Sequence, residues 1–369
     1  MAIIDKLFIN QFRNLKSQII SPNQHINLFI GANAQGKTNL IEAIYYLGHN
    51  RSFKTKTIKE VINFDFHQFQ LQAKIGKNTI KLEKSKNQNN ISINQQKINI
   101  SSQLSQVLPI QIITPDKGFI VNGTPKNKRS YLDWGVFHVK PKTTKLFKNH
   151  NKILKNIQAL LIQNKADELD FWFLELAKTA LKINQNRAEY LQKLKQTKLP
   201  NQSKLLKNLI KSFDKFDYKF SSGWPKEVDE TDAKSMYKYL SNNTSQLLKN
   251  KHLKYGSHKA SIIFSLNNKN ECFLSRGEQK ALSIIFWLTQ VLFLVNLKTQ
   301  PIVLIDDLCS ELDDEKINTI LQYLQALNVQ TFITDIGHNL SIMDGVNSSI
   351  FQIKSGVIQQ LDLANKKPR

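Results

Sequence analysis

The chain has 369 residues, of which 41% are hydrophobic, and its formal net charge at pH 7 is +23. This length fits two or three domains of roughly 100–200 residues, and the hydrophobic share supports a buried core, so a disordered chain is excluded. The two cysteines, Cys272 and Cys309, exclude a disulfide framework and a four-cysteine zinc site. The first residues lack the basic-then-apolar order of a signal peptide, so we expect a cytoplasmic protein.

The positive charge is concentrated in the first two thirds of the chain. Residues 1–139 carry a net charge of +11 and residues 140–260 carry +14, whereas residues 261–369 carry −2. Such a distribution favours a polyanionic partner. However, 46 of the 52 basic residues are lysines, so a general lysine bias is the alternative explanation. The charge alone does not establish nucleic-acid binding.

The N-terminal part is predicted to be rich in strands. Apolar runs at 3–9 and 26–30, alternating residues between 66 and 100, and a run at 110–113 are typical of strands. The second run leads into the pattern glycine, four residues, Gly-Lys-Thr, and then into a helical pattern. Such glycines let backbone N–H groups converge on phosphate oxygens at a helix N-terminus, which predicts a nucleotide-binding loop. The loop consists of Gly31, Ala32, Asn33, Ala34, Gln35, Gly36, Lys37 and Thr38.

The middle of the chain is predicted to be helical. Apolar residues recur at three- and four-residue spacing over 146–161, 173–181 and 205–216, and Pro200 separates the last two of these helices. The apolar stretch 281–297 falls at the low edge of the roughly 17–25 residues that cross a membrane. We therefore expect a buried core helix there and no membrane association.

The C-terminal part returns to an α/β pattern. The strand expected at 302–305 has no polar residue, as in a parallel sheet that is covered on both faces. A helix over 314–327, a strand at 331–334 and a terminal hairpin follow. The order of elements predicts one α/β sheet domain built from both chain ends, with a helical lobe inserted between them.

Two acids, Asp306 and Asp307, end the predicted apolar strand. An acid at this position can reach a Mg²⁺ ion held beside Thr38, and a second acid can orient or deprotonate the attacking water. A solvated turn is the alternative, but the phosphate loop favours catalysis. We therefore expect a nucleotide and Mg²⁺ as cofactors, Lys37 at the β- and γ-phosphates, Thr38 and Asp306 at the metal, and Asp307 at the water.

Residues 274–280, Leu-Ser-Arg-Gly-Glu-Gln-Lys, resemble the signature motif of ABC-type ATPases. That resemblance implies that Ser275 and Gly277 bind the γ-phosphate held by a second subunit, and that 310–313 form the D-loop. The alternative is a serine N-cap with Glu278 at the capping-box position, and both readings can hold together.

The whole chain resembles the RecF family of DNA replication and repair proteins, ABC-type ATPases related to SMC heads. The segments that carry this resemblance are 12–15, the phosphate loop, 47–53, 113–116, 123–125, 129–135, 258–260, 306–307 and 310–313. Four of the six arginines, Arg13, Arg51, Arg129 and Arg276, fall in these segments or in the signature. In a lysine-rich chain, a retained arginine favours a site that needs a planar fork for phosphate or carboxylate.

The resemblance implies an ABC-type ATPase head with an antiparallel β arm and an inserted α-helical lobe. Its expected parts are 1–139 and 256–369 for the head and 140–255 for the lobe. The resemblance also implies an ATP-dependent homodimer that closes on single-stranded and duplex DNA at gaps and releases it by slow ATP hydrolysis. Implied partners are RecO and RecR, with RecA loaded through them, and an implied role is SOS induction.

Two other functions stay open, an ATP-binding subunit of an ABC transporter and a nucleotide-dependent DNA-binding protein that does not hydrolyse ATP. The residue of the Q-loop is also open between Gln111 and Asp116. The sensor of the γ-phosphate is unassigned, because 334–337 follow the strand where transporters place histidine and His338 comes later.

Overall fold

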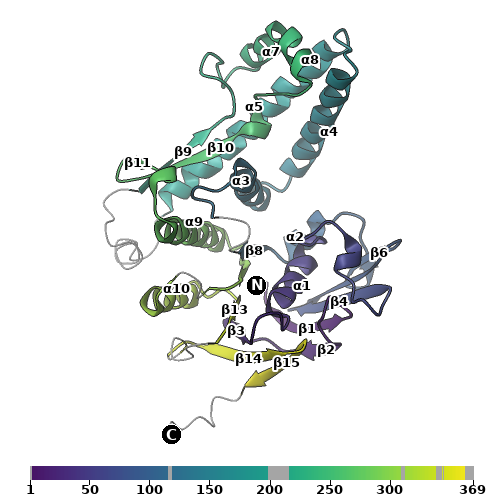
Figure 1. Cartoon of the computed structure of the whole chain (residues 1–369), viewed down its shortest axis with the longest axis vertical. Coiled ribbons are helices and arrows are strands. Elements are labelled where there is room, and N and C mark those ends of the chain that lie inside the picture. Colours follow the sequence, from purple (N-terminus) through teal and green to yellow (C-terminus); the bar gives the residue numbers. More distant parts are fainter. Residues whose placement is uncertain are drawn as a thin grey trace. The chain divides into compact units, whose positions relative to one another are not determined.

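A computed structural model gives the fold of the protein. It describes residues 2–114, 119–197, 216–308, 312–337, 343 and 345–361. These residues form two compact units, drawn together in Figure 1 and described here one at a time. The first unit contains the described residues up to 114 and from 284 onward, and the second contains 119–197 and 216–283.

A six-stranded sheet in the first unit is built from both ends of the chain, in the order β15-β14-β3-β13-β12-β8. All neighbouring strands run parallel except β15, which pairs antiparallel with β14. Every residue of β3, β12 and β13 is buried, as expected for parallel strands that are covered on both faces. The strands are β3 (Ile26–Ile30), β8 (Ile110–Ile113), β12 (Ile302–Ile305), β13 (Thr331–Asp335), β14 (Ser348–Lys354) and β15 (Val357–Leu361).

The second sheet of this unit is the predicted antiparallel arm, in the order β2-β1-β4-β5-β6-β7. Buried and more exposed residues alternate along β4, so one face of the arm packs against the core. The strands are β1 (Ile4–Asn10), β2 (Gln18–Ile20), β4 (Gln68–Ile75), β5 (Asn78–Ser85), β6 (Asn89–Ile93) and β7 (Gln96–Lys97).

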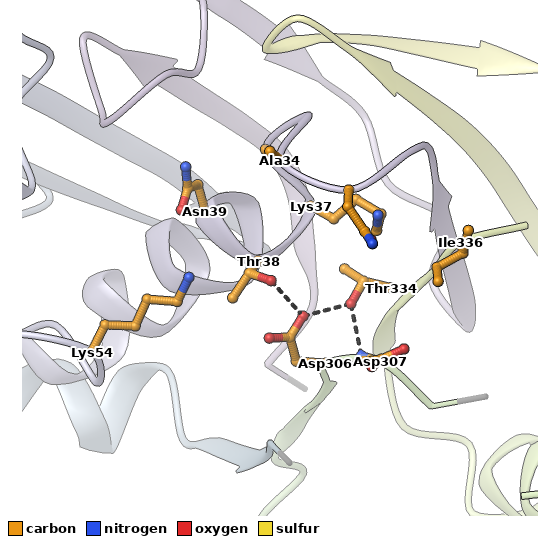
Figure 2. Close-up of a pocket in the computed structure, with 11 residues that line it drawn as sticks. Ala34, Lys37, Thr38, Asn39, Lys54, Asp306, Asp307, Thr334 and Ile336 are labelled. Carbon is orange, nitrogen blue, oxygen red and sulfur yellow. Dashed lines mark hydrogen bonds between the residues drawn. The ribbon is translucent and has the colours of Figure 1, made fainter. Parts of the chain in front are cut away.

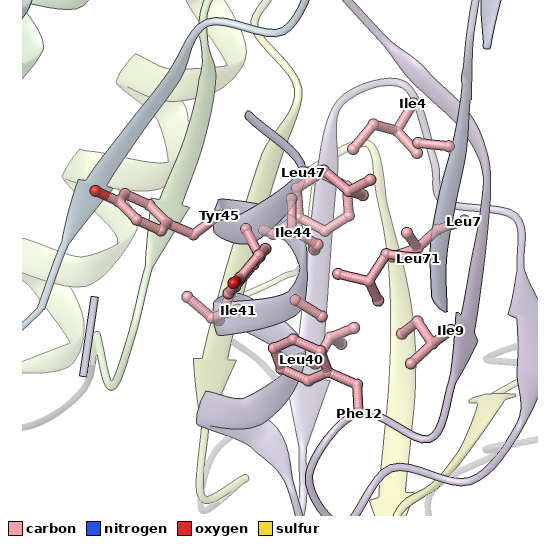
Figure 3. Close-up of a cluster of buried hydrophobic side chains, with 14 of the residues drawn as sticks. Ile4, Leu7, Ile9, Phe12, Leu40, Ile41, Ile44, Tyr45, Leu47 and Leu71 are labelled. Carbon is pink, nitrogen blue, oxygen red and sulfur yellow. The ribbon is translucent and has the colours of Figure 1, made fainter. Parts of the chain in front are cut away.

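Helix α1 (Lys37–His49) lies between the two sheets of the first unit. Figure 3 shows apolar side chains of α1 against those of β1 and β4, and the same cluster includes Leu304 and Phe332 of the parallel sheet. The start of α1, which ends the phosphate loop, is thereby fixed by a core on both sides. This unit also contains η1 (Ile58–Glu60), α2 (Ser102–Val107) and α10 (Asp314–Ala326).

The second unit is mainly helical. Its helices are α3 (Pro125–Val139), α4 (Thr143–Ile162), α5 (Leu169–Gln196), α7 (Ala233–Asn242) and α8 (Thr244–Asn250). An antiparallel sheet of order β11-β10-β9 accompanies them, formed by β9 (Phe216–Ser221), β10 (Ser261–Leu266) and β11 (Lys269–Asn270). Two short 3₁₀ helices, η3 (Ser257–Lys259) and η4 (Glu271–Phe273), complete the unit before α9 (Arg276–Asn296) begins.

The boundaries of the compact units differ from those expected between 139 and 140 and between 255 and 256. The first change of unit falls after residue 117 and the last between 283 and 284. The reason is that α3 packs on α5 and β10, and β10 pairs with β9, so all of these belong to the second unit. The helix expected over 205–216 lies outside the described residues, except that Phe216 begins β9.

Helix α9 covers the apolar stretch that the sequence singled out. Within the described residues it is the one helix whose length and composition would allow it to cross a membrane, and 67% of its apolar window is buried inside the protein. A buried window of this kind is typical of a core helix.

Candidate nucleotide-binding site

The phosphate loop follows β3 at the carboxyl edge of the parallel sheet and ends where α1 begins at Lys37. Gly36 has a φ of 118°, a left-handed value that favours glycine. A Cβ atom at this position would also lie 3.0 Å from side-chain atoms of both Asn14 and Leu15. The loop therefore requires glycine here, and it leads into a helix N-terminus, which favours anions.

The side chain of Lys37 lies back over its own loop. Its Nζ donates hydrogen bonds to the carbonyl oxygens of the first two loop residues, at 2.6 and 2.9 Å. Burial lowers the pKa of Lys37, whereas nearby carboxylates, led by Asp307, act to raise it. The ammonium group thus sits between the loop carbonyls and the acids at the ends of β12 and β13.

A chain of hydrogen bonds joins α1 to the ends of β12 and β13, as Figure 2 shows. The Thr38 hydroxyl donates to Oδ1 of Asp306 at 3.1 Å, and the Thr334 hydroxyl donates to the same oxygen at 2.6 Å. The backbone N–H of Asp307 in turn donates to Oγ1 of Thr334 at 3.0 Å. Three segments that are far apart in the sequence therefore meet at one carboxylate.

Asp306 is almost fully buried, with 7% of its surface exposed. Burial raises the pKa of its carboxyl group, and the hydrogen bonds from Thr334 and Thr38 act in the opposite direction. The positive charge of Lys54 also favours the ionised form. A buried carboxylate with a perturbed pKa beside a phosphate loop is typical of a functional site.

These groups line a cavity of about 310 Å³. The lining residues are Asn33, Ala34, Gly36, Lys37, Thr38, Asn39, Lys54, Asp306, Asp307, Thr334 and Ile336. The structure therefore brings together most of the residues that the sequence assigned to the phosphates, the metal and the water. Gly31, Ala32 and Gln35 belong to the same loop without lining this cavity.

Sequence reasoning missed the roles of Thr334 and Lys54 in this cavity. Thr334 was noted as the last residue of the predicted strand 331–334 and at the start of 334–337, where no γ-phosphate sensor was assigned, and nothing in the sequence says that β13 lies between β3 and β12. Parallel order in the sheet places Thr334 between the phosphate loop and Asp306. A useful signal is a hydroxyl residue at the end of a buried strand, since carboxyl ends of parallel strands meet at one edge.

Asp306 and Thr38 fit a magnesium ion by their chemistry. Both offer oxygen ligands, and Mg²⁺ is commonly bound by one or two protein oxygens together with water and substrate phosphates. Among the described residues, no group of three or more His, Cys, Asp or Glu side chains is placed to form an all-protein metal site. The pair therefore suits an ion that arrives with a nucleotide.

Asp307 has a left-handed backbone, with a φ of 56°. A residue other than glycine in this region is uncommon and is most often aspartate or asparagine, and such residues cluster at functional sites. The conformation lets the main chain turn after β12 while its N–H bonds to Thr334. Asp307 lines the cavity, and its expected role beside the attacking water stays a prediction.

The signature residues form the capping box that the sequence left as an alternative. The N–H and the hydroxyl of Ser275 both donate to Oε2 of Glu278 at 2.8 Å, and the Glu278 N–H donates to the serine oxygen at 3.3 Å. Gly277 is exposed, and a Cβ atom there would meet nothing within 4 Å. Both residues belong to the second unit, so their expected role at a γ-phosphate stays a prediction.

Three arginines form hydrogen bonds with other residues of the chain. Arg13 bonds to both carboxylate oxygens of Glu42, at 2.5 and 2.8 Å, as the planar fork predicts. Arg129 donates to the carbonyl oxygen of Ala260 at 2.9 Å. The fork of Arg187, which was outside the family segments, binds both oxygens of Asp133.

In the described part of the chain, no residue expected for the Q-loop or the D-loop lines this cavity. Gln111 is buried in β8, and its Oε1 has no hydrogen-bond partner among the described residues. Asp116, the other Q-loop candidate, lies outside the described residues, as do His338 and the first two residues of the expected D-loop. The last of these, Asp313, caps α10 by accepting from the Lys316 N–H at 2.9 Å.

A glycine loop before a helix, a threonine at its start and a carboxylate at the end of a parallel strand define a phosphate-loop nucleotide-binding site, and the signature-like residues at the start of α9 are those of an ABC-type ATPase head. The head carries an antiparallel arm, and the chain ends contribute to one sheet.

The chain belongs to the RecF family. The RecF/RecN/SMC N-terminal domain matches residues 3–359. The DNA replication and repair protein RecF of Haemophilus influenzae (strain 86-028NP) is 33% identical over 368 residues, which cover 97% of this chain and 99% of that protein. RecF of Psychromonas ingrahamii is 34% identical over 367 residues, with 96% and 99% covered.

Solved structures agree with this assignment. The recombination mediator protein RecF with ATP, in the RecFOR pathway, matches with a TM-score of 0.83 and 25% identity over 98% of each chain. An SMC head domain from Pyrococcus furiosus matches with a TM-score of 0.58 and 14% identity, over 99% of this chain and 97% of that one. The second likeness shows a shared fold only.

Proposed function

We propose that this chain is an ATP-dependent DNA-binding clamp of replication and recombinational repair. The observation that supports this best is the hydrogen-bonded set of Thr38, Asp306 and Thr334 beside the phosphate loop. Family membership supports it independently, because a RecF relative has been solved with ATP. The ABC transporter alternative is set aside, since RecF relatives match nearly the whole chain.

In this proposal, the phosphate loop binds ATP and the side chains around it prepare hydrolysis. When ATP binds, the ammonium group of Lys37 gives up its hydrogen bonds to the loop carbonyl oxygens and binds the β- and γ-phosphates instead. The loop N–H groups bind the remaining phosphate oxygens. Thr38 and Asp306 hold Mg²⁺, which neutralises phosphate charge when it is bound. Asp307 orients the attacking water, and an aspartate reaches less far than a glutamate, which is consistent with slow turnover.

Dimerisation completes the site in this proposal. Ser275 and Gly277 at the start of α9 contact the γ-phosphate held by a second copy, and the Ser275 hydroxyl leaves Glu278 to do so. ATP then favours the dimer through contacts that exist only there. Family membership further supports binding to single-stranded and duplex DNA at gaps, cooperation with RecO and RecR in loading RecA, and SOS induction.

Light scattering with and without ATP and DNA tests the clamp. ATP should convert the wild-type monomer to a dimer, and Lys37→Ala should abolish this change because the phosphates lose their fixed cation. Lys77→Ala removes the same charge from the exposed turn after β4 and should dimerise normally. A Lys37→Ala protein that still dimerises with ATP contradicts the proposal. Dimerisation and DNA retention without phosphate release would instead favour the non-hydrolysing alternative.

A further inference from the structure

The turn between β14 and β15 contacts the phosphate loop, although the two are 320 residues apart in the chain. The N–H of Ser355 donates to Oε1 of Gln35 at 2.6 Å. The N–H of Gly356 donates to the main-chain carbonyl oxygen of the same Gln35 at 3.1 Å. This residue of the loop is therefore fixed through both its side chain and its main chain.

The turn is anchored on its other side by the segment that follows β1. The carbonyl oxygen of Gly356 accepts hydrogen bonds from the Lys16 N–H at 3.0 Å and from Nε2 of Gln18 at 2.8 Å. Oε1 of Gln18 accepts from the N–H of Ile358 at 2.8 Å, so one amide side chain holds both the turn and the start of β15. These hydrogen bonds fix the position of the turn independently of its contact with the phosphate loop.

The same segment also contacts the loop directly. Nδ2 of Asn14 donates to the carbonyl oxygen of Ala34 at 3.3 Å, and Oδ1 of Asn14 accepts from Asn39 of α1 at 2.8 Å. The loop residues 34 and 35 are therefore held by two elements that are themselves bonded to each other. None of these contacts uses a group assigned above to the γ-phosphate, the metal or the water.

The contact depends on glycine at 356. Ser355 and Gly356 have φ values of 48° and 78°, both left-handed. A Cβ atom on residue 356 would overlap the carbonyl group of Asn14 and lie 3.2 Å from the Cα atom of Leu15, both of which are backbone. A side chain here would therefore push the turn away from the loop.

We propose that the β14–β15 turn is a positioning element of the nucleotide site, which holds Gln35 and so fixes the phosphate loop in its binding conformation. This inference rests on the proposed ATP binding. A loop that is ordered before the ligand arrives loses less conformational freedom on binding, so its affinity is higher. Residues of this C-terminal hairpin thereby determine nucleotide affinity without touching the nucleotide.

Titration of the full chain with ATP, by calorimetry, tests the proposal with a matched pair of variants. Gly356→Ala should weaken ATP binding about tenfold or more, and Gln18→Ala, which removes the anchor of the turn, should weaken it by a smaller factor. Gly76→Ala is the control, because Gly76 has a φ of 54° in the β4–β5 hairpin, with open space around a Cβ atom. It introduces the same backbone strain without touching the loop and should bind ATP within about twofold of wild type.

The outcomes separate the two proposals. Wild-type binding that Gly356→Ala and Gln18→Ala leave unchanged, even when thermal stability falls, overturns the role of the turn alone. A wild-type chain that binds no ATP overturns the proposed function and this inference with it. If Gly356→Ala does not fold, Gln18→Ala decides the matter by the same comparison.

Hydrogen exchange of the turn amides provides a second test, because ATP would not change their exchange rates if the contact were purely structural. Coupling between two sites is reciprocal, so a turn that favours ATP binding is itself stabilised by ATP. ATP should slow exchange of the Ser355 and Gly356 amides several-fold in wild type and have little effect on the equivalent hairpin amides around Gly76. Equal exchange with and without ATP would overturn the coupling.

Discussion

The buried carboxyl group of Asp306 lowers the stability of the fold when it is ionised. Burial raises its pKa, so its proton is bound more tightly in the folded protein than in the unfolded chain. The free energy of unfolding must therefore fall as the pH rises from the usual aspartate pKa through the raised one. A residue whose ionised form lowers the stability of its own fold is explained by function, here by the magnesium ion proposed above.

Asp306→Asn should stabilise the nucleotide-free protein and weaken magnesium-dependent ATP binding. Asparagine is neutral and its Oδ1 can still accept from Thr38 and Thr334. The melting temperature at neutral pH should rise by about 2 °C, and the gain over wild type should grow as the pH rises above the ordinary aspartate pKa. Thermal unfolding at several pH values measures this, with Asp65→Asn, an exposed acid, as the control. A gain that does not change with pH would refute the argument.

Single residues of the site were largely predictable where the pattern is local. The loop 31–38 and the pair Asp306–Asp307 were assigned from spacing and from the strand before them, and five of the loop residues line one cavity with both acids. Thr334 and Lys54 were not, because their role depends on which strands and loops are neighbours in space. The spacing of Ser275 and Glu278 offered a capping box as an alternative, and the structure contains it.

At the scale of elements, hydrogen bonds to Glu42 connect helix α1 to two loops. Its buried carboxylate accepts from Arg13 at 2.5 and 2.8 Å and from the Ser52 hydroxyl at 2.5 Å. The same Arg13 donates to the carbonyl oxygen of Glu60 at 2.7 Å. Ser52 also accepts from the N–H of Lys54, so the network reaches the loop whose lysine lines the nucleotide cavity.

Glu42→Ala should lower the free energy of unfolding by about 3–5 kcal/mol, because it leaves the largely buried Arg13 without its partner. Urea denaturation measures the loss. Glu175→Ala breaks an exposed pair with Lys178 and should cost less than about 1 kcal/mol. The double variant Arg13→Met with Glu42→Leu should recover much of the loss, since no charge is then left unpaired. If Glu42→Ala lowered the free energy of unfolding no more than Glu175→Ala does, this account would be contradicted.

The sequence predicted individual strands and helices better than the compact units to which they belong. The strands at 26–30, 110–113 and 302–305 and the terminal hairpin appear where periodicity placed them. The placement of α3 in the second unit was missed, because an amphipathic helix does not say which core it faces. Strand β10 was missed as well, since its partner β9 lies more than 40 residues earlier and pairing at that distance leaves no local pattern.

At the scale of the whole molecule, the net charge of +23 is divided unevenly. The last third, 261–369, carries −2 and contains Asp306 and Asp307, so part of its acidity belongs to the ATPase site. The excess of positive charge lies in 1–260, which contains the arm and most of the second unit. If DNA binds there, ATP should increase affinity by bringing two such surfaces together.

Salt dependence of DNA binding tests this prediction. Each phosphate neutralised by lysine or arginine contributes a slope of about −0.9 to a plot of log affinity against log salt concentration. Fluorescence anisotropy with gapped and fully duplex DNA should give a slope of about −4 or steeper with ATP and a shallower one without it, because dimerisation doubles the basic surface. Lys37→Ala should show the shallower slope under both conditions, whereas Lys77→Ala should keep the ATP response. A slope near zero would mean that the lysines reflect composition and do not contact DNA, and a slope that ATP does not change would separate DNA binding from dimer closure.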